Sequence, residues 1–421
     1  MPALDTREKL AAFGGPKAIA RHDPDLFDWP IVTAEDEQAV LEVLRRKAMS
    51  GTDVTQQFER EIAAFHGRKF ALAHPNGTSA LHMAMHGCGV GPGDEIISPS
   101  FTFWATCTQA LSLGAKIVFA ESRPDTLNLD PADIEHRITK RTKAITVVHY
   151  CGYPADMDPL LEIANRHGLK VIEDVSHAHG GHYKGRLVGS IGHAAGMSMM
   201  AGKALAIGEA GMLLTDDRQV FERAVAFGHY ERTRPGTKYC DEPCLTDPDL
   251  MKYAGIPMGG VKYRLQQLAS AMGRVQLKHY PARLAALQAA MNRFWDLVEA
   301  EIPDGVTAHR PPQGSGSDCG GWYFPRGLYD PSKMRGVPAS RFCELLNKEG
   351  FHAAAGANEP LHLHPLFKDA GCKIEPLPVT ESLPGRCFGV PWFKHDHPER
   401  IAVYANALIK VARAVRAGEA S

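Results

Sequence analysis

Between Lys69 and Thr215, short apolar segments alternate with amphipathic ones, and this alternation constrains the fold more than any other feature of the chain. Strand-like segments lie at residues 70–73, 95–98, 116–119, 144–149, 170–174, 196–199 and 212–215. Helical periodicity near residues 78–87, 104–112, 131–138 and 157–167 separates most of them. Such alternation is typical of a mostly parallel sheet with helices on both faces. The direct succession of the last two strands predicts one antiparallel neighbour.

The segments outside this region predict an arm, a large domain and a smaller domain. Residues 1–30 form an arm punctuated by Gly and Pro, and residues 31–280 form the large domain, including a loop-rich stretch at 228–262. Residues 281–421 supply a long connecting helix and a small α+β domain. We expect helix starts at Thr33 and Thr55. The remaining expected elements are a helix from Leu265, a separate helix at 284–302, a strand at 322–325 and helices at 338–349 and 397–416.

Composition narrows the class of protein. The chain has 421 residues, 44% hydrophobic and 23% charged, with a formal net charge of −1 and no basic block. This balance argues against nucleic acid or anionic membrane as a partner. The charged N-terminus is unlike a signal peptide, and no apolar run reaches the roughly 18 residues of a membrane helix, so we expect a cytoplasmic protein. Nine scattered cysteines predict reduced thiols, and Cys240 with Cys244 lacks a second pair, so no metal site is expected.

One lysine has unusual neighbours. Lys203 is flanked by the small and apolar residues 201–202 and 204–206, follows Ser198 by five positions, and precedes a Gly-Glu-Ala-Gly turn at 208–211. Burial among such residues would lower the pKa of the amine. A neutral amine is the form that makes a Schiff base with an aldehyde cofactor. By itself, the segment is more typical of a solvated lysine in a turn, because most lysines are solvated.

Two further segments carry an acid and a candidate anion site. Asp174 ends the strand at 170–174, where ligands collect in open parallel sheets, and its carboxylate could hold a pyridinium nitrogen protonated. Asn76, Gly77 and Thr78 lie between a strand and a helix, where free N–H groups can bind a phosphate. Each segment alone could instead be an ordinary helix cap. Lysine, acid and phosphate site together indicate pyridoxal 5'-phosphate (PLP).

In these motifs and their order, the chain resembles the DegT/DnrJ/EryC1/StrS aminotransferases, which use PLP to aminate keto-sugars and keto-cyclitols. The similar segments are residues 76–81, 99–103, 173–180, 198–211, 260–264 and 362–365. The resemblance covers roughly residues 30–415. It implies an α/β fold of the fold-type I PLP-dependent transferases, which are aspartate aminotransferase-like, with a smaller α+β C-terminal domain.

The resemblance also implies catalytic roles. Lys203 would anchor PLP and move protons, and Asp174 would pair with the ring nitrogen. His177 would contact the 3'-oxygen or ring face of PLP, although a purely structural imidazole remains an alternative. Phe103 would stack on the ring, with Trp104 as the competing candidate. His179 and His193 are expected to be structural.

The phosphate would be held by Asn76, Gly77, Thr78 and Ser198. At Lys262 the chain departs from the family, because many members have an asparagine there that contacts the phosphate from the neighbouring subunit. Lys262 could contact the phosphate as a point charge or reach the substrate. The resemblance therefore implies a homodimer with shared active sites.

The predicted function is a ping-pong transfer of an amino group from L-glutamate or L-glutamine to a keto-sugar or keto-cyclitol. Some sugar dehydratases of this family carry histidine at the anchor position, so Lys203 favours transamination. The alternatives are a PLP-dependent dehydratase or eliminase and a non-catalytic PLP-binding regulator. Residues 14–16 and 391–393 favour the cyclitol or antibiotic-type amino-sugar branch over a nucleotide-linked keto-sugar.

Overall fold

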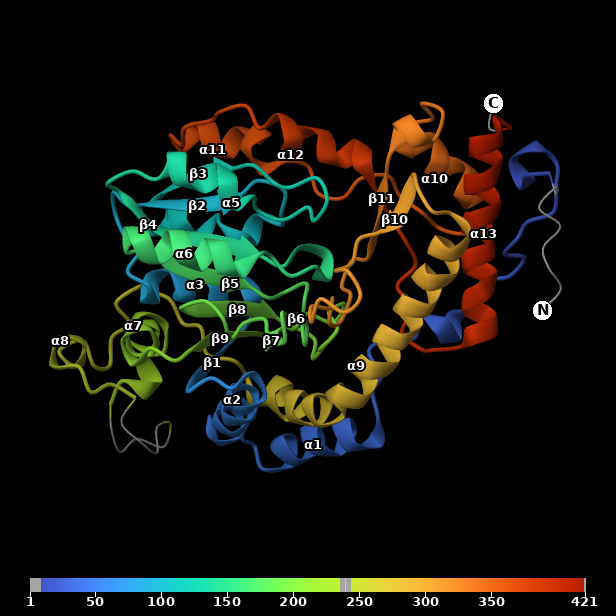
Figure 1. Cartoon of the computed structure of the whole chain (residues 1–421). Helices are drawn as coiled ribbons and strands as arrows, with labels where there is room; N and C mark the ends of the chain where they lie inside the picture. The colour runs from blue at the N-terminus through green and yellow to red at the C-terminus, as the bar shows by residue number, and fades with distance from the viewer. Residues whose placement is uncertain (1–8, 235–238, 240–243, 420–421) are drawn as a thin grey trace.

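A seven-stranded sheet forms the centre of the computed structural model, which describes residues 9–234, 239 and 244–419 (Figure 1). The strands follow the order β1-β9-β8-β5-β4-β2-β3. Their bounds are β1 (Phe70–His74), β2 (Glu95–Pro99), β3 (Lys116–Ala120), β4 (Thr142–Val148), β5 (Lys170–Asp174), β8 (Ala194–Ser198) and β9 (Gly211–Thr215). Strand β9 is antiparallel to β1 and β8, and the other neighbours are parallel. The predicted α/β fold class is confirmed.

Helices cover both faces because successive side chains of each strand point to opposite sides. One face packs on α3 (Gly77–Gly87), α4 (Gln109–Ser112) and α7 (Arg218–Gly228), with Ile172 among its core residues. The other packs on α2 (Asp53–His66), α6 (Met157–His167) and the first part of α9 (Gln267–Glu301), with Val171 in its core. The remaining elements in this part are α1 (Ala34–Arg45), η3 (Trp104–Thr106), α5 (Pro131–Ile134), η4 (Glu135–Arg137), η5 (Tyr150–Gly152), β6 (His182–Tyr183), β7 (Arg186–Leu187), η6 (Tyr230–Arg232) and α8 (Pro248–Met251).

Helix α9 corrects the prediction of two helices after Leu265. It is one 35-residue helix with Pro281 inside it. Proline removes one backbone hydrogen bond, but α9 packs on α1 and α2 at one end and on α13 (Pro398–Ala417) at the other, and these contacts stabilise both halves (Figure 1). The proposed domain boundary at 280/281 lies inside this helix, and the division 1–30, 31–280 and 281–421 stays a prediction.

Two local predictions are wrong. Residues 322–325 form an irregular loop rather than a strand, because Trp322 (φ 51°) and Phe324 (φ 60°) adopt left-handed backbone conformations. The strand β11 (Arg326–Tyr329) begins directly afterwards. Thr55 does not cap α2, which begins at Asp53 with Thr52 as N-cap. Thr55 lies inside the helix, and its hydroxyl is 2.8 Å from that of Ser270 on α9.

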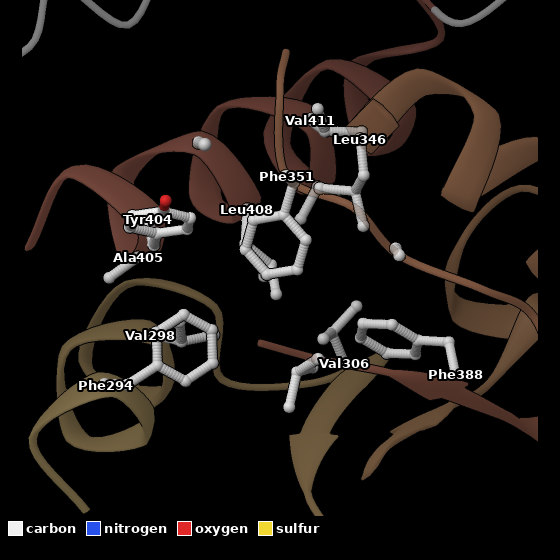
Figure 2. Packing of buried hydrophobic residues seen from close by; sticks show 14 of the residues in the cluster. Phe294, Val298, Val306, Leu346, Phe351, Phe388, Tyr404, Ala405, Leu408 and Val411 are labelled. Atoms are coloured by element: carbon white, nitrogen blue, oxygen red, sulfur yellow. The ribbon is translucent and has the colours of Figure 1, made fainter. Parts of the chain in front are cut away.

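The C-terminal part has its own sheet and core. Strands β10 (Val306–Ala308), β11 and β12 (Cys387–Gly389) pair antiparallel. Phe294 and Val298 of α9 meet Phe351, Phe388 and Leu408 in the core shown in Figure 2. The elements around it are η7 (Pro331–Lys333), α10 (Ala339–Lys348), η8 (Leu361–Leu363), α11 (Pro365–Asp369), α12 (Pro378–Ser382), η9 (Leu383–Arg386) and α13.

The N-terminal arm packs against this C-terminal core. It contains η1 (Ala11–Phe13) and η2 (Pro24–Leu26), and Leu10, Ile19 and Leu26 are buried in the core. Figure 1 shows the first described residues of the arm, in blue, beside α13. Within the described ranges, no helix has both the length and the apolar character needed to cross a bilayer, and no group of three His, Cys, Asp or Glu could hold a metal ion. Cys240 lies outside the described residues.

Truncation of Phe294 should destabilise the protein. The ring is fully buried, so Phe294→Ala should lower the free energy of unfolding of the C-terminal core by about 3–5 kcal/mol. Leu297, on the same helix, is 39% exposed. Leu297→Ala should therefore cost no more than about 1 kcal/mol. Urea unfolding of both variants measures the difference, and equal losses would contradict the packing in Figure 2.

Candidate active site

A cavity of about 290 Å³ opens where β5 and β8 end and α3 begins. The C-terminal ends of parallel strands are the usual ligand site in open α/β sheets. The residues that line it are Asn76, Gly77, Thr78, Leu81, Phe103, Trp104, Ala105, Asp174, Ser176, His177, Ser198, Met200, Lys203, Glu209 and Tyr323. The structure thus brings together every predicted site residue except Lys262.

Asp174 is held in a fixed orientation at the end of β5. Its Oδ2 accepts a hydrogen bond from the Thr106 hydroxyl at 2.8 Å, and its Oδ1 accepts one from the Ser176 N–H at 3.0 Å. The Thr106 hydroxyl also lies 2.7 Å from that of Thr102. The side chain is buried, so these donors replace water around the carboxylate. Sequence reasoning missed Thr106, whose role depends on packing across 68 positions of the chain, and Ser176, which donates from only two positions away.

Lys203 has a buried amine on the cavity wall. The residue is 7% exposed, and Nζ lies 3.5 Å from the centroid of the Tyr323 ring. Burial lowers the pKa of this amine to about 8, although the nearby Asp174 and Cys151 act in the opposite direction. The pKa is therefore shifted in the direction that the apolar neighbours of Lys203 predict. About a tenth of the amine is therefore neutral at pH 7, and the neutral form is the one that acts as a nucleophile.

His177 presents a neutral imidazole to the cavity. Burial holds its pKa well below the usual range. Its Nδ1 accepts a hydrogen bond from the Cys151 N–H at 3.3 Å. The proton of the neutral ring therefore resides on Nε2, which leaves an N–H donor. The ring centroid is 4.9 Å from that of Tyr323.

The turn between β1 and α3 fits a phosphate group. Asn76 caps α3 through its Oδ1, which accepts from the Ser79 N–H at 2.9 Å. Gly77 and Thr78 follow at the N-terminal end of the helix, where N–H groups and the helix dipole favour an anion. A Cβ on Gly77 would lie 2.6 Å from Cβ of Ser198. Only glycine therefore allows the turn to approach the end of β8 this closely.

The positions of the other predicted residues leave the stacking residue open and put Lys262 outside the cavity. Phe103 and Trp104 both line the cavity, are 44% and 46% exposed, and have ring centroids 5.0 Å apart, so both remain candidates for stacking. Lys262 is exposed and lies outside the lining of its own chain's cavity. His179 accepts from the Leu205 N–H at 3.2 Å, and His193 accepts from the Val171 N–H at 3.0 Å, which are structural contacts.

Tyr323 is a cavity residue that sequence reasoning missed. The prediction of a strand at 322–325 gave no reason to place its ring against Lys203. The left-handed loop conformation at Trp322 and Phe324 brings it there.

Comparison with known proteins decides the family. Residues 30–408 match the sequence model of the DegT/DnrJ/EryC1/StrS aminotransferase family. The chain belongs to this family. Membership makes the protein an aminotransferase by class, and its solved neighbours are PLP aminotransferases. The resemblance of the motifs is thus confirmed, and the residues that line the cavity fit PLP.

Relatives of this chain carry names that point to different functions. The spore coat polysaccharide biosynthesis protein SpsC of Bacillus subtilis is 32% identical over 87% of this chain and 92% of its own. A GDP-perosamine synthase of Caulobacter vibrioides is 38% identical over 56% of this chain and 60% of its own. A putative L-glutamine:3-amino-2,3-dideoxy-scyllo-inosose aminotransferase of Micromonospora echinospora is 38% identical over 53% and 54%.

Solved structures of the family share the fold over nearly the whole chain. An aminotransferase from Psychrobacter cryohalolentis has a TM-score of 0.79 at 28% identity, covering 91% of this chain and 98% of the other. A 3-amino-5-hydroxybenzoic acid synthase has a TM-score of 0.77 at 26% identity, covering 93% and 100%.

The lowered pKa of Lys203 predicts the pH dependence of cofactor uptake. Only the neutral amine attacks an aldehyde, so the rate at which apoenzyme takes up PLP should rise with pH and level off above about 8 rather than near the ordinary 10.5. Because the charge of Asp174 raises this pKa, Asp174→Ala should move the midpoint to lower pH. Stopped-flow absorbance measures the rate. A midpoint near 10, or equal uptake by Lys203→Ala, would refute this assignment.

Proposed function

We propose that this family member transfers an amino group from L-glutamate or L-glutamine to the keto group of a sugar or cyclitol, using PLP anchored on Lys203. The observation that carries the proposal is the shared cavity of a buried lysine amine and a fixed carboxylate, Lys203 and Asp174. A protein that only binds PLP has no need of a carboxylate at the ring nitrogen, so this pair supports catalysis over regulation.

PLP, when bound, supplies an electron sink for the carbanion that forms at the substrate carbon. Asp174 would keep the proton on the pyridine nitrogen, and the Nε2–H of His177 would donate to the 3'-oxygen. Gly77, Thr78 and Ser198 would hold the phosphate group. Phe103 or Trp104 would cover a face of the ring and exclude water from it.

Lys203 would also move the reacting proton. A general acid–base works best when its pKa lies near the working pH, and the pKa of this amine is lowered to about 8. The amine can therefore accept a proton from the substrate carbon and return it at a neighbouring atom. Tyr323 lies beside the amine and limits the directions in which it can swing.

The charge of the cavity supports an uncharged acceptor. Lys203 is the single cation among the described residues that line the cavity, and Glu209 adds a carboxylate. A nucleotide-linked keto-sugar would bring a diphosphate, which proteins usually bind with Arg or Lys. The relative named for a scyllo-inosose substrate accords with a keto-cyclitol, and the GDP-perosamine synthase keeps a nucleotide-linked keto-sugar as the second candidate.

We further propose a homodimer in which each chain completes the active site of the other. Lys262 is exposed and separate from its own cavity. Near it, Tyr253, Ile256 and Met258 are 41%, 75% and 42% exposed, which is unusual for large apolar side chains. An interface that covers this loop would bury them and could bring Lys262 to the partner's phosphate site.

A spectral titration tests the transamination. Addition of L-glutamate or L-glutamine to the PLP-loaded enzyme should convert the bound cofactor to its pyridoxamine form. Scyllo-inosose or a nucleotide-linked 4-keto-sugar should then reverse the change, which identifies the acceptor class. No change with any amino donor would remove transamination, whereas release of water from a sugar without an amino donor would favour a dehydratase.

Asp174→Ala should separate binding from chemistry. Loss of the carboxylate removes the partner of the ring nitrogen, so the conversion rate should fall by about 10²-fold or more while most of the PLP stays bound. Asp125→Ala removes an exposed carboxylate paired with Arg123 and should leave the rate unchanged. An unaltered rate in Asp174→Ala would contradict the assigned role.

Hybrid dimers test the shared site. Lys203→Ala and Lys262→Glu should each inactivate the homodimer. Co-expression of the two chains should restore about a quarter of the wild-type activity, because half of the dimers are mixed and each has one intact site. No recovery would place Lys262 in its own chain's site, and full activity of Lys262→Glu alone would exclude it from the site.

A further inference from the structure

The N-terminal arm reaches the backbone of the anchoring lysine. The indole Nε1–H of Trp29 donates a hydrogen bond to the Lys203 carbonyl oxygen at 2.9 Å, across 174 positions of the chain. The Lys203 N–H donates to Met200 O at 2.8 Å. Residues 199–210 lie outside any helix or strand, so no ladder of hydrogen bonds fixes the Lys203 peptide. A side chain of the arm fulfils that function instead.

Trp29 is held in place by the segment that precedes α13. The Lys394 N–H donates to Leu26 O at 2.9 Å, and the ring of Phe27 stacks on that of Phe393 at 5.7 Å. The amine of Lys394 lies 5.2 Å from the Trp29 ring centroid and contacts the Trp392 ring. Backbone pairing and aromatic packing thus dock the arm on residues 392–394 rather than leave it loose in solvent.

Residues 392–394 also connect to the side-chain amine of Lys203, through the ring of Tyr323. The ring of Trp392 meets that of Tyr323 edge-on at a centroid distance of 5.5 Å. Tyr323 in turn lies 3.5 Å from Nζ of Lys203. Residues 392–394 therefore support both contacts, one at the carbonyl oxygen of Lys203 through Trp29 and one at its amine through Tyr323.

We propose that Trp29 is a positioning residue for Lys203, and that docking of the N-terminal arm sets where the reactive amine lies in the cavity. The proposal rests on the proposed function in so far as Lys203 carries the cofactor. It requires no contact between Trp29 and the substrate, and Trp29 does not line the cavity. Its effect passes through the peptide whose orientation it fixes.

Trp29→Phe is the discriminating variant, because it removes the N–H donor and keeps an aromatic ring. An amine displaced by a fraction of an ångström loses alignment with the atoms it must reach, so kcat for the amino-donor half-reaction should fall roughly tenfold with KM little changed. The pH midpoint of the absorption band of bound PLP should shift by about half a unit or more. PLP uptake by the apoenzyme should also slow.

Trp295→Phe is the matched control. Trp295 is a fully buried indole in the C-terminal core whose Nε1 has no hydrogen-bond partner among the described residues. This variant should lower the melting temperature and leave the PLP absorption midpoint unchanged. If Trp29→Phe changes kcat only in proportion to its folded fraction, with the PLP midpoint of wild type, the proposal is overturned.

The failures of the two proposals are distinguishable. Absence of any spectral response to amino donors in the wild type would remove the proposed transamination. The absorption midpoint and the uptake rate would still report on Trp29, because they need only PLP bound at Lys203. Wild-type values of both in Trp29→Phe would remove the positioning role even if transamination is found.

Discussion

The first residue of β9 sets the geometry on which the site depends. Gly211 pairs with His74 at the end of β1 and with Ser198 at the end of β8, so both strands end at the same level. A Cβ on Gly211 would lie 2.1 Å from Asn76 O, so no larger residue leaves room for the turn before α3. Strand β5 adds Asp174, which pairs with Gly196. The antiparallel strand therefore brings the candidate phosphate site, the acid and the lysine-bearing segment together at one edge of the sheet.

The adjacent acids of β5, Glu173 and Asp174, have different surroundings because successive side chains of a strand point to opposite faces of the sheet. Glu173 points away from the cavity, where His149 lies 3.0 Å from its carboxylate and the backbone N–H groups of Gly189, Ile191 and Gly192 donate to it. Asp174 points into the cavity with donors on both oxygens.

Another hydrogen-bonded set of side chains has the geometry of a catalytic relay but no access to a ligand. The Ser100 hydroxyl lies 2.8 Å from Nδ1 of His362, and Nε2 of His362 lies 3.1 Å from the carboxylate of Glu381. Because Ser100 is fully buried, this relay joins the end of β2 to the segment around α12 rather than acting on a ligand.

The strands were predictable because each is an apolar run buried on both faces, and the observed bounds of β1 to β5 differ from the predicted ones by at most two residues. The positions of Lys203, Asp174 and Gly77 were predictable because the immediate sequence neighbours of each residue already indicate its chemistry. Thr106, Tyr323 and Trp29 act through contacts with chain-distant residues, for which local periodicity holds no signal. Ser176 acts on Asp174 from two positions away, through a turn that periodicity does not predict either. The single helix α9 was missed for a related reason. A proline at position 281 locally predicts the end of a helix. Packing of α9 against both parts of the molecule keeps the helix continuous.

Comparison of the buried lysines Lys203 and Lys394 shows how the charges of the site change the effect of burial on the pKa of an amine. Desolvation lowers the pKa of Lys394 to about 5, and no charge opposes that shift. Lys203 is buried to a similar extent, but its pKa is lowered only to about 8, because the carboxylate of Asp174, followed by Cys151, favours the protonated form. Lys394 is therefore neutral at neutral pH and can pack between indole rings like an apolar side chain. Lys203 can both hold and release a proton, so Asp174 adjusts the lysine that it faces as well as the cofactor that it would bind.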